Sequence, residues 1–483
     1  ERVVEVDDAT MEKYLEEGDA DPSTLHAPIT KALREGHIIP VCFTSAKNLI
    51  GIRDLIKVII RHMPAPVEAN AAPFVDAQGN PVHIAPDPDQ PVIARVFKVV
   101  SDPFVGKIGV FRVHRGRIKA GTELYAGDAK KPFKVVHPLL LQGKNTADTD
   151  ELHAGDIGAL SKVDDLYYGC VLHSDPADAG IVLPRPPYPR PMFGLAIEPA
   201  RRGDESRMGE VLQKMLAEDP TLAVDHDVQL NETVLRGLTE MHVRTVLERM
   251  KDQFKLEVTT SAPSVPYRET IGAAAEGHAR HKKQTGGAGQ FGEVFLKVEP
   301  LPRGAGFEFV DRVKGGVIPF NLIPAVEKGV REVLATGYMA GYPITDIRVT
   351  VYDGKSHPVD SKEVAFVAAG RKAMLDALAK AQPQILEPIV EIAVSAPEST
   401  MGAITGDIAA RRGQVQGTDN LAPGVMEIKA LVPLSELTGY AARLHALTQG
   451  AGAFTMDLAD YHTVPAQKAQ ELASHYQRKD EED

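Results

Sequence analysis

Apolar residues follow two different spacings along this chain, and the order of these spacings divides it into units. Between residues 92 and 183 short alternating runs follow one another with no helical run between them, and glycines separate them. Alternation over four to eight residues is typical of half-buried strands. This part of the chain is therefore predicted to form a small antiparallel β-barrel. The predicted strands are 92–100, 109–113, 117–125, 133–141 and 157–163.

A strand–helix–strand–strand–helix–strand order then appears twice. In the first copy, residues 192–259, apolar residues at helical spacing predict helices over 204–218 and 240–254. In the second copy, residues 388–457, the helices are predicted over 401–411 and 436–447. Two copies of this order indicate two split βαβ units.

A larger α/β unit is predicted between these copies, over residues 265–385. One helix is expected over 321–336, ended by a left-handed cap at Gly337. A second helix is expected to start at Ser361, a good N-cap residue. Near the start of the chain, the apolar run 37–43 predicts a buried strand and residues 52–63 a helix, as at the end of an open α/β sheet. A short helix is expected after Pro465.

Composition limits the function classes. A chain of 483 residues predicts about three or four domains. Lys and Arg total 54 and Asp and Glu 66, so the net charge is −12 and a nucleic acid must be met by a local basic patch. The two cysteines lie far apart in sequence with no zinc spacing, which argues against a disulfide scaffold and fits a reducing cytoplasm. No apolar run is long enough for a membrane span.

The densest basic patch comprises Arg280, Lys282 and Lys283, directly before a glycine-rich stretch. It has two interpretations, a solvated loop or a contact with the nucleic-acid backbone, and charge alone favours the solvated loop. Arg411 and Arg412, at a predicted helix end, complement the helix dipole, with RNA contact as the alternative.

Two glycine motifs invite a nucleotide-binding interpretation. Residues 287–292 match GxGxxG, but an alternating run follows where the dinucleotide fingerprint needs a helix, so a loop between strands is predicted. Gly354-Lys355-Ser356 would complete a phosphate loop only with glycine at position 349, which is Val349. We therefore expect no GTP or ATP hydrolysis by this chain alone.

The chain resembles elongation factor G, the bacterial translocation GTPase, along nearly all of its length. The motifs that carry the resemblance are Ala196-Ile197-Glu198-Pro199, Ala217-Glu218-Asp219-Pro220-Thr221, Tyr267-Arg268-Glu269-Thr270, the stretch 286–292, Lys314-Gly315-Gly316-Val317-Ile318-Pro319, Ala340-Gly341-Tyr342-Pro343 and Val432-Pro433-Leu434-Ser435-Glu436. The resemblance implies a multidomain α/β and β fold. Its expected parts are the end of a G domain (1–64), a linker (65–90), a β-barrel (91–185), a ferredoxin-like domain (190–263), an α/β domain of ribosomal-protein-like fold (265–385), a second ferredoxin-like domain (386–465) and a tail (466–483).

The resemblance also implies sites. Ser45, Ala46 and Lys47 are similar to the last guanine-binding motif of the family. The remaining GTP and magnesium motifs are expected upstream of Glu1 in a full-length parent, and no cofactor is expected on this fragment. Two loops resemble those that enter the decoding site beside tRNA, mRNA and rRNA. Because Arg280, Lys282 and Lys283 lie next to these loops, the resemblance favours the RNA interpretation of these three residues. The loop residues are Gly286, Gly287, Gly289, Gln290, Lys355, Ser356 and His357.

The implied function is GTP-dependent translocation of tRNA and mRNA by a cytoplasmic monomer that contacts both ribosomal subunits and no membrane. Ala288 stands where the family often has Arg, and Lys355-Ser356 replaces a more usual Ser-Tyr, which is compatible with a specialised paralogue. A ribosome protection or recycling factor of the same architecture is therefore the alternative. A dinucleotide-dependent enzyme, supported only by GxGxxG, is the third hypothesis.

Overall fold

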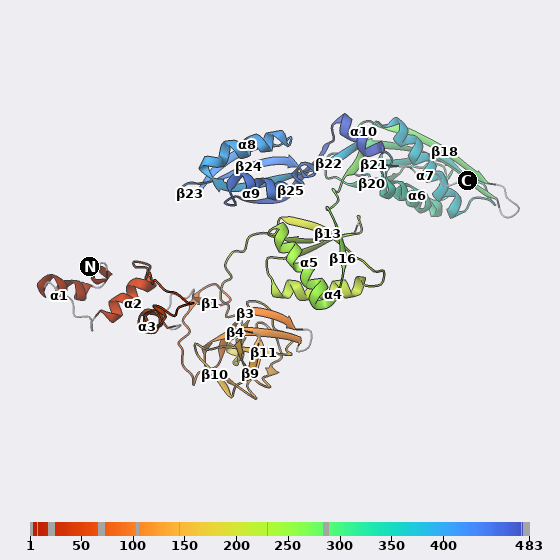
Figure 1. Ribbon diagram of the computed structural model, residues 1–483. Coiled ribbons are helices and arrows are strands. Elements are labelled where there is room, and N and C mark those ends of the chain that lie inside the picture. The colour runs from red at the N-terminus through yellow and green to blue at the C-terminus, as the bar shows by residue number, and fades with distance from the viewer. Residues whose placement is uncertain are drawn as a thin grey trace. The chain divides into compact units, whose positions relative to one another are not determined.

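A computed structural model describes residues 3–6, 8–17, 25–65, 73–102, 106–143, 145–228, 230–283, 289–474 and 476 (Figure 1). By its internal contacts the chain divides into two compact units. The first comprises Glu1–Pro189, Ser206–Thr221 and Asp252–Lys255, and the second comprises Arg190–Glu205, Leu222–Lys251 and Leu256–Asp483. None of the described helices is both long enough and apolar enough to cross a membrane.

The N-terminal segment is helical, but the strand predicted over residues 37–43 is wrong. These residues have no regular structure, and the side chains of Ile39 and Phe43 are 83% and 91% exposed. A buried strand needs a neighbouring strand for its N–H and C=O groups, and no described residue pairs with this run. The helices here are η1 (Val4–Val6), α1 (Asp8–Glu17), α2 (His26–Arg34) and α3 (Ile52–His62).

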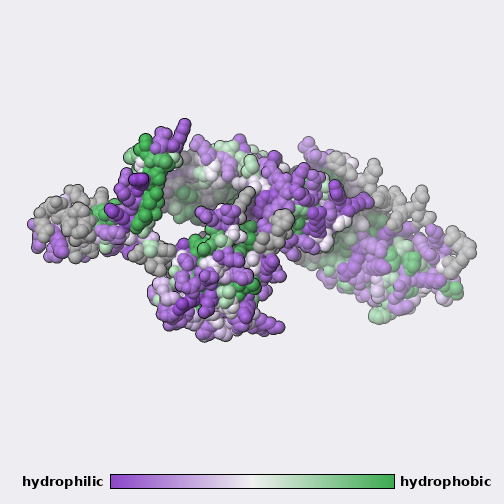
Figure 2. Space-filling view, turned by 60° about the horizontal axis from the view of Figure 1, so that its bottom comes forward, coloured by the Kyte–Doolittle hydropathy of each residue, from purple (hydrophilic) through white to green (hydrophobic). Residues whose placement is uncertain are grey.

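Helix α3 confirms the predicted helix but not its predicted packing. No residue of α3 is buried, and Ile59 and Ile60 are 51% and 75% exposed. Hydrophobic side chains accordingly show on the surface at the left of Figure 2, where the N-terminal segment lies. The assignment of this segment to the end of a G domain therefore stays a prediction.

An antiparallel eight-stranded sheet follows, curled into a half-barrel, and it confirms the predicted antiparallel β architecture. Its order is β7-β6-β12-β3-β4-β11-β8-β9, and Phe111, Leu124 and Leu172 are fully buried on its inner side. Its strands are β3 (Ile93–Asp102), β4 (Gly106–Arg115), β6 (Glu123–Ala126), β7 (Phe133–Lys134), β8 (Leu139–Gln142), β9 (Asn145–Asp148), β11 (Ile157–Ser161) and β12 (Val171–His173).

Two short strand pairs and a 3-10 turn accompany the half-barrel. The pairs are β1 (Phe74–Val75) with β2 (Pro81–Val82), and β5 (Arg117–Lys119) with β10 (Glu151–His153); the turn is η2 (Pro176–Asp178). The first pair lies in the segment predicted as a linker. It is nonetheless anchored, because Phe74 is buried against Ile93 and Val171 on the outer wall of the half-barrel.

The first split βαβ unit has the predicted element order. Its four-stranded sheet has the order β14-β15-β13-β16, and Val243, Val246 and Met250 are buried on α5. The elements are β13 (Phe193–Pro199), α4 (Glu205–Glu218), β14 (Ala223–Asp227), β15 (Glu232–Gly237), α5 (Glu240–Phe254) and β16 (Val258–Ser261).

The α/β unit that follows contains a second four-stranded sheet, of order β18-β19-β21-β20, in which only β20 and β21 run parallel. Helix α7 packs closely on β18: a Cβ on Gly277 would lie 2.1 Å from the Ala373 carbonyl oxygen, so glycine is required there. The elements are β18 (Ala275–Lys283), β19 (Gln290–Pro300), β20 (Phe307–Asp311), η3 (Phe320–Leu322), α6 (Ile323–Thr336), β21 (Ile347–Lys355) and α7 (Glu363–Lys380).

Helix α6 ends at Thr336 as predicted, but the predicted left-handed cap after it and the predicted N-cap of α7 need correction. Gly337 has φ 74° but ψ 178°, which is not the left-handed helical cap, and a Cβ there would lie 2.5 Å from the Tyr342 carbonyl oxygen. Gly337 is still the C-cap residue, because its N–H donates to the Val333 carbonyl oxygen across 2.9 Å. Its positive φ and the close approach of the backbone both require glycine. Helix α7 begins at Glu363 with Lys362 as its N-cap, so Ser361 does not cap it.

The C-terminal unit repeats the split βαβ order around the fifteen-residue strand β22. Strands β24 and β25 flank β22, and β23 is the edge strand beyond β24. The predicted helix over 436–447 is divided into η5 and α9, because Gly439 adopts a left-handed conformation with φ 71°. The elements are β22 (Pro383–Pro397), η4 (Glu398–Thr400), α8 (Met401–Ala410), β23 (Gln414–Ala422), β24 (Val425–Pro433), η5 (Leu434–Leu437), α9 (Tyr440–Thr448), β25 (Ala453–Thr463) and α10 (Ala466–Ser474).

Strand β17 (Arg268–Ile271) joins the α/β unit to this sheet, because it pairs with the first residues of β22. On the other side, the buried Glu269 carboxylate accepts four backbone N–H bonds of 2.7–3.1 Å from the loop after α6. The donors are Tyr338, Met339, Ala340 and Tyr342. Two of the motifs that carry the family resemblance therefore bind each other here.

Candidate nucleic-acid interface

The two loops singled out in the sequence lie at the same end of the α/β sheet. The β18–β19 ladder ends at the pair Lys283 and Gln290, and β21 ends beside it at Lys355. Gly286 and Gly287 lie outside the described residues. We call the remaining residues of this end, Lys282, Lys283, Gly289, Gln290 and 355–362, the domain tip.

Direct contacts hold the two segments of the domain tip together. The Phe291 N–H donates to the Asp360 carbonyl oxygen across 2.9 Å, and the Ser361 hydroxyl donates to the Phe291 carbonyl oxygen across 2.8 Å. A Cβ on Gly289 would lie 2.8 Å from the Asp360 carboxylate. The fold thus brings together residues about 70 positions apart, as the resemblance implied but the residue spacing alone did not.

His357 is held by its backbone and leaves part of its ring in solvent. Its N–H donates to the Ser361 hydroxyl oxygen across 2.8 Å, and its Nδ1 accepts the Asp360 N–H at 3.3 Å. The same Nδ1 also lies 3.3 Å from the Asp360 carboxylate, so Asp360 holds the ring through both its backbone and its side chain. The side chain is 51% exposed, so it remains able to contact a ligand.

Arg280 has its charge compensated within the protein. Its guanidinium donates to both oxygens of Glu293 at 3.1 Å, and His278 Nε2 lies 2.9 Å from the same carboxylate. Burial alone raises the pKa of Glu293, but the hydrogen bonds from His278 and Arg280 outweigh it and hold the pKa below its ordinary value. Of the three cationic side chains predicted to contact RNA, Arg280 is therefore the one that is paired with a residue of the sheet.

The lysines of the domain tip are different. Lys282, Lys283 and Lys355 are exposed, and no ion pair or side-chain hydrogen bond holds them within the described part of the chain. Lys362 belongs to the same group, although sequence reasoning missed it. It was missed because a helix was expected from Ser361 onward, which made Lys362 an ordinary first-turn residue instead of a loop residue beside His357.

Ser45, Ala46 and Lys47 form an exposed turn in the first compact unit. The Ser45 N–H donates to the Ile50 carbonyl oxygen across 2.9 Å, and the Asn48 N–H donates to the Ser45 hydroxyl at 3.3 Å. Within the described residues, the Ala46 and Lys47 amides have no backbone acceptor. These two amides are therefore available to an outside hydrogen-bond acceptor, and the guanine-binding role of the turn stays a prediction.

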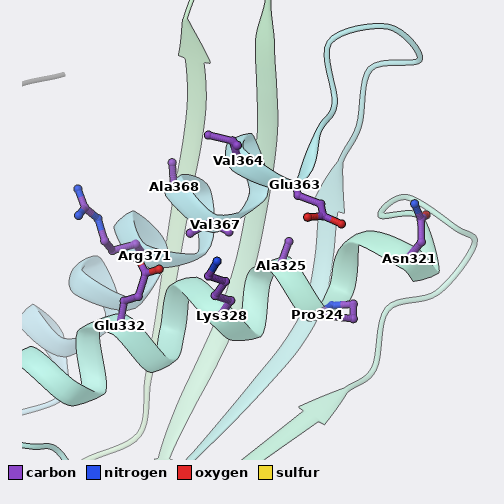
Figure 3. Close-up of a pocket in the computed structure, with 10 residues that line it drawn as sticks. All are labelled: Asn321, Pro324, Ala325, Lys328, Glu332, Glu363, Val364, Val367, Ala368 and Arg371. Carbon is purple, nitrogen blue, oxygen red and sulfur yellow. The ribbon is translucent and has the colours of Figure 1, made fainter.

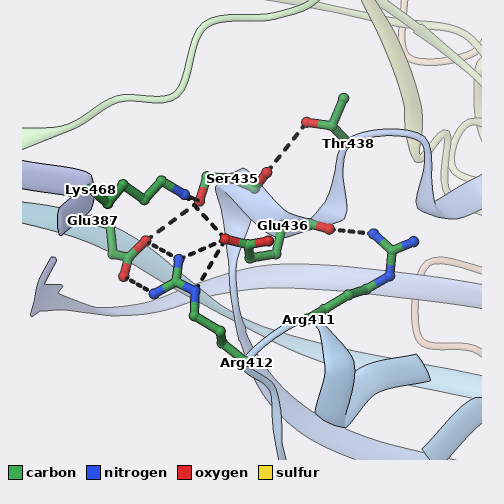
Figure 4. A network of polar contacts seen from close by, with 7 residues as sticks. All are labelled: Glu387, Arg411, Arg412, Ser435, Glu436, Thr438 and Lys468. Atoms are coloured by element: carbon green, nitrogen blue, oxygen red, sulfur yellow. Dashed lines mark hydrogen bonds and ion pairs between the residues drawn. The ribbon is translucent and has the colours of Figure 1, made fainter. Parts of the chain in front are cut away.

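Arg411 and Arg412 are engaged inside the C-terminal unit (Figure 4). Arg412 donates to the two oxygens of Glu387 at 2.7 and 2.8 Å and also to Glu436 at 2.9 Å. Arg411 donates to the Glu436 carbonyl oxygen, and Lys468 of α10 donates to the Glu436 carboxylate at 3.1 Å. This network favours the structural interpretation of both arginines over RNA contact.

A groove of about 460 Å³ lies between α6 and α7 (Figure 3). Glu363 and Val364, the first residues of α7, line one end of it, and Glu332 and Arg371 line the other end. Lys328 adds a further positive charge. The groove therefore carries both signs of charge and does not extend the cationic surface of the domain tip.

Comparison with known proteins identifies the class to which this architecture belongs. Four sequence models of translation-factor domains match in order: elongation factor G domain 2 (residues 91–174), domain III (188–262), domain IV (263–382) and the elongation factor G C-terminus (384–472). A crystal structure of a protein from Thermus thermophilus is 35% identical, with a TM-score of 0.74; the match covers 98% of this chain and 68% of that one. The chain belongs to the elongation factor G family and is an elongation factor G-like translation factor.

Proposed function

We propose that this protein acts in GTP-dependent translocation of tRNA and mRNA on the ribosome, and that its domain tip enters the decoding site. The observation that carries the proposal is the junction of two loops, distant in sequence, into one surface with Lys282, Lys283 and Lys355 free. The proposed partners are both ribosomal subunits, with rRNA, tRNA and mRNA at the decoding site, and the protein acts as a cytoplasmic monomer.

GTP with Mg²⁺ is the proposed cofactor of the complete protein, where hydrolysis supplies the free energy of the movement. The turn of Ser45, Ala46 and Lys47 offers backbone donors for the base. The described residues include no cluster of three or more acidic, histidine or cysteine side chains that could hold a metal ion. We assign positioning and RNA contact to this chain, with the domain tip as the contact surface.

The charges of the domain tip indicate which side chains can contact RNA. Each exposed lysine of the domain tip is available to a phosphate without first losing an internal partner, whereas Arg280 would have to leave Glu293. Lysine contacts to phosphates release counterions, so binding weakens as salt rises. His357, fixed by Ser361 and Asp360, adds a half-exposed imidazole ring beside these charges.

The test is mRNA movement on ribosomes, measured with the complete protein carrying Lys282→Ala/Lys283→Ala or His357→Ala. The matched control is Lys130→Ala/Lys131→Ala, an adjacent pair of exposed lysines in the first compact unit. We expect the tip variants to slow translocation and to make ribosome binding less dependent on salt, by about one unit of logarithmic slope per lysine. If neither tip variant is slower than the control, the assignment of the domain tip is wrong.

A ribosome protection or recycling role is the second candidate, favoured by Lys355-Ser356 and Ala288 at positions where the family usually differs. Such a factor would release a ribosome-bound drug or separate the subunits without moving mRNA. Drug-rescue and subunit-splitting assays run beside the translocation assay distinguish the two candidates. Activity in one of these assays without mRNA movement would replace the translocation proposal.

A further inference from the structure

Three basic side chains share one patch on the outer wall of the half-barrel. Arg95 on β3 and Arg112 on β4 are direct cross-strand partners. The flanking Val96, Phe111 and Val113 point into the core, so the two arginines project from the opposite face. His114 follows two residues after Arg112 and lies on that same face.

The two arginines have no counter-charge within the described chain. Neither Arg95 nor Arg112 forms an ion pair with a described carboxylate, and Nε and one Nη of Arg95 are shielded from solvent without a hydrogen-bond partner. The neighbouring arginines behave differently, because Arg115 pairs with Asp178 and Arg117 pairs with Asp89. Like charges directly opposite one another destabilise a sheet, and shielded unpaired donors add a further cost.

The surroundings of His114 keep its imidazole uncharged. The ring of Phe74 contacts His114 edge-on, with 4.9 Å between centroids, and screens it from water. Burial, followed by the charges of Arg112 and Arg95, lowers the pKa of His114 to about 4. The imidazole is therefore neutral at pH 7 in the free protein, and both charged groups that act on it are arginines.

We propose that Arg95, Arg112 and His114 form a binding site for one phosphate group. Guanidinium groups bind phosphate through paired N–H bonds, and a bound anion would offset the repulsion between the two arginines. The phosphate comes either from an RNA backbone or from a free phosphate ion, and both sources present at least two unesterified oxygens that can accept these bonds. The site is separate from the domain tip and does not depend on the proposed translocation function.

The test is thermal unfolding of the protein in inorganic phosphate and in chloride at equal ionic strength. We expect phosphate to raise the melting temperature more than chloride does. Arg112→Met, which keeps the apolar stem, should lose this difference and bind phosphate about 10- to 100-fold more weakly. The control Arg117→Met should keep it. In phosphate-free buffer, Arg112→Met should melt at the same or a higher temperature than the wild type, because a repulsion has been removed.

NMR titration of His114 in the wild-type protein provides a second measurement that needs no variant. Bound phosphate should raise the pKa of His114 from about 4 toward its ordinary value. Equal effects of phosphate and chloride, or an unchanged His114 titration, would overturn the proposal. Competition with a short RNA oligonucleotide then identifies the source: displacement of phosphate assigns an RNA backbone, and retention of phosphate assigns a free ion.

Discussion

Ser361 and Phe291 are joined by a hydrogen bond of 2.8 Å, in which the Ser361 hydroxyl donates to the Phe291 carbonyl oxygen. The same hydroxyl oxygen accepts the N–H of His357. One side chain therefore fixes the His357 turn to the end of β19. The arrangement of the domain tip therefore depends on Ser361, which is uncharged and is not one of the residues predicted from the sequence to contact RNA.

Ser361→Ala should loosen the domain tip while the rest of the α/β unit stays folded. Loss of two hydrogen bonds is expected to lower the free energy of unfolding by about 1–2 kcal/mol. Urea unfolding measures this cost, and ribosome binding should weaken in parallel. Thr405→Ala is the control, because its hydroxyl bonds only within α8. An effect no larger than that of the control would show that the turn is held by other contacts.

Glu269→Gln should destabilise the junction between the α/β unit and β22. A carboxylate accepts all four backbone N–H bonds, whereas an amide turns its own donors toward two of them. The expected loss is about 3 kcal/mol in urea unfolding, because buried donors are left unsatisfied. Glu276→Gln, at an exposed carboxylate that accepts one bond from Tyr352, should cost far less. Equal losses in the two variants would contradict this interpretation.

Glu293 should make stability depend on pH in the acid range. Its pKa is lowered in the folded protein relative to the ordinary 4.5. Its contribution is therefore present above that value and is lost as the pH falls through the folded pKa. Unfolding free energies measured from about pH 6 to about pH 3 should fall more steeply for the wild type than for Glu293→Gln. Parallel curves would mean that its bonds to His278 and Arg280 do not stabilise the fold.

Arg412→Lys should weaken the C-terminal unit although it keeps the charge. Lysine cannot make the two parallel bonds that the guanidinium makes to Glu387, so a loss of about 1–2 kcal/mol is expected. Arg443→Lys is the control, because Arg443 is more exposed and makes a single bond to Asp407. Thermal unfolding of the two variants provides the comparison. A control variant that melts as early as Arg412→Lys would show that paired bonding is not the cause.

Periodicity predicted most of the architecture because each split βαβ unit carries its own core. The run of Val243, Val246 and Met250 contains enough information to place α5, and the structure buries these residues. The run 37–43 shows the limit of the method. An apolar run indicates a strand only when a neighbour pairs with it, and pairing is not a local property of the sequence.

The candidate site was predictable in its location but not in its internal contacts. Glycines and lysines marked the loops, while the distinction between Arg280 and Lys282 depends on Glu293 reaching across from β19. Ser361 was predicted as a helix cap because serine favours that position, and the fold uses its hydroxyl for a tertiary bond instead. Arg95 and Arg112 gave no sequence signal, because 17 positions separate two residues that register places side by side.

Strand β22 has a consequence for anyone who exchanges parts between relatives. The matched sequence models meet between residues 382 and 384, yet Pro383–Leu386, at and after that point, pair with β17, which lies well before it. The later residues of the same strand pair with β24. A chimera joined there would keep both parental sequences intact and still place a foreign β17 against a native β22. Transplants that carry β17 together with β22 preserve this backbone pairing, so the practical unit of exchange is larger than either sequence domain.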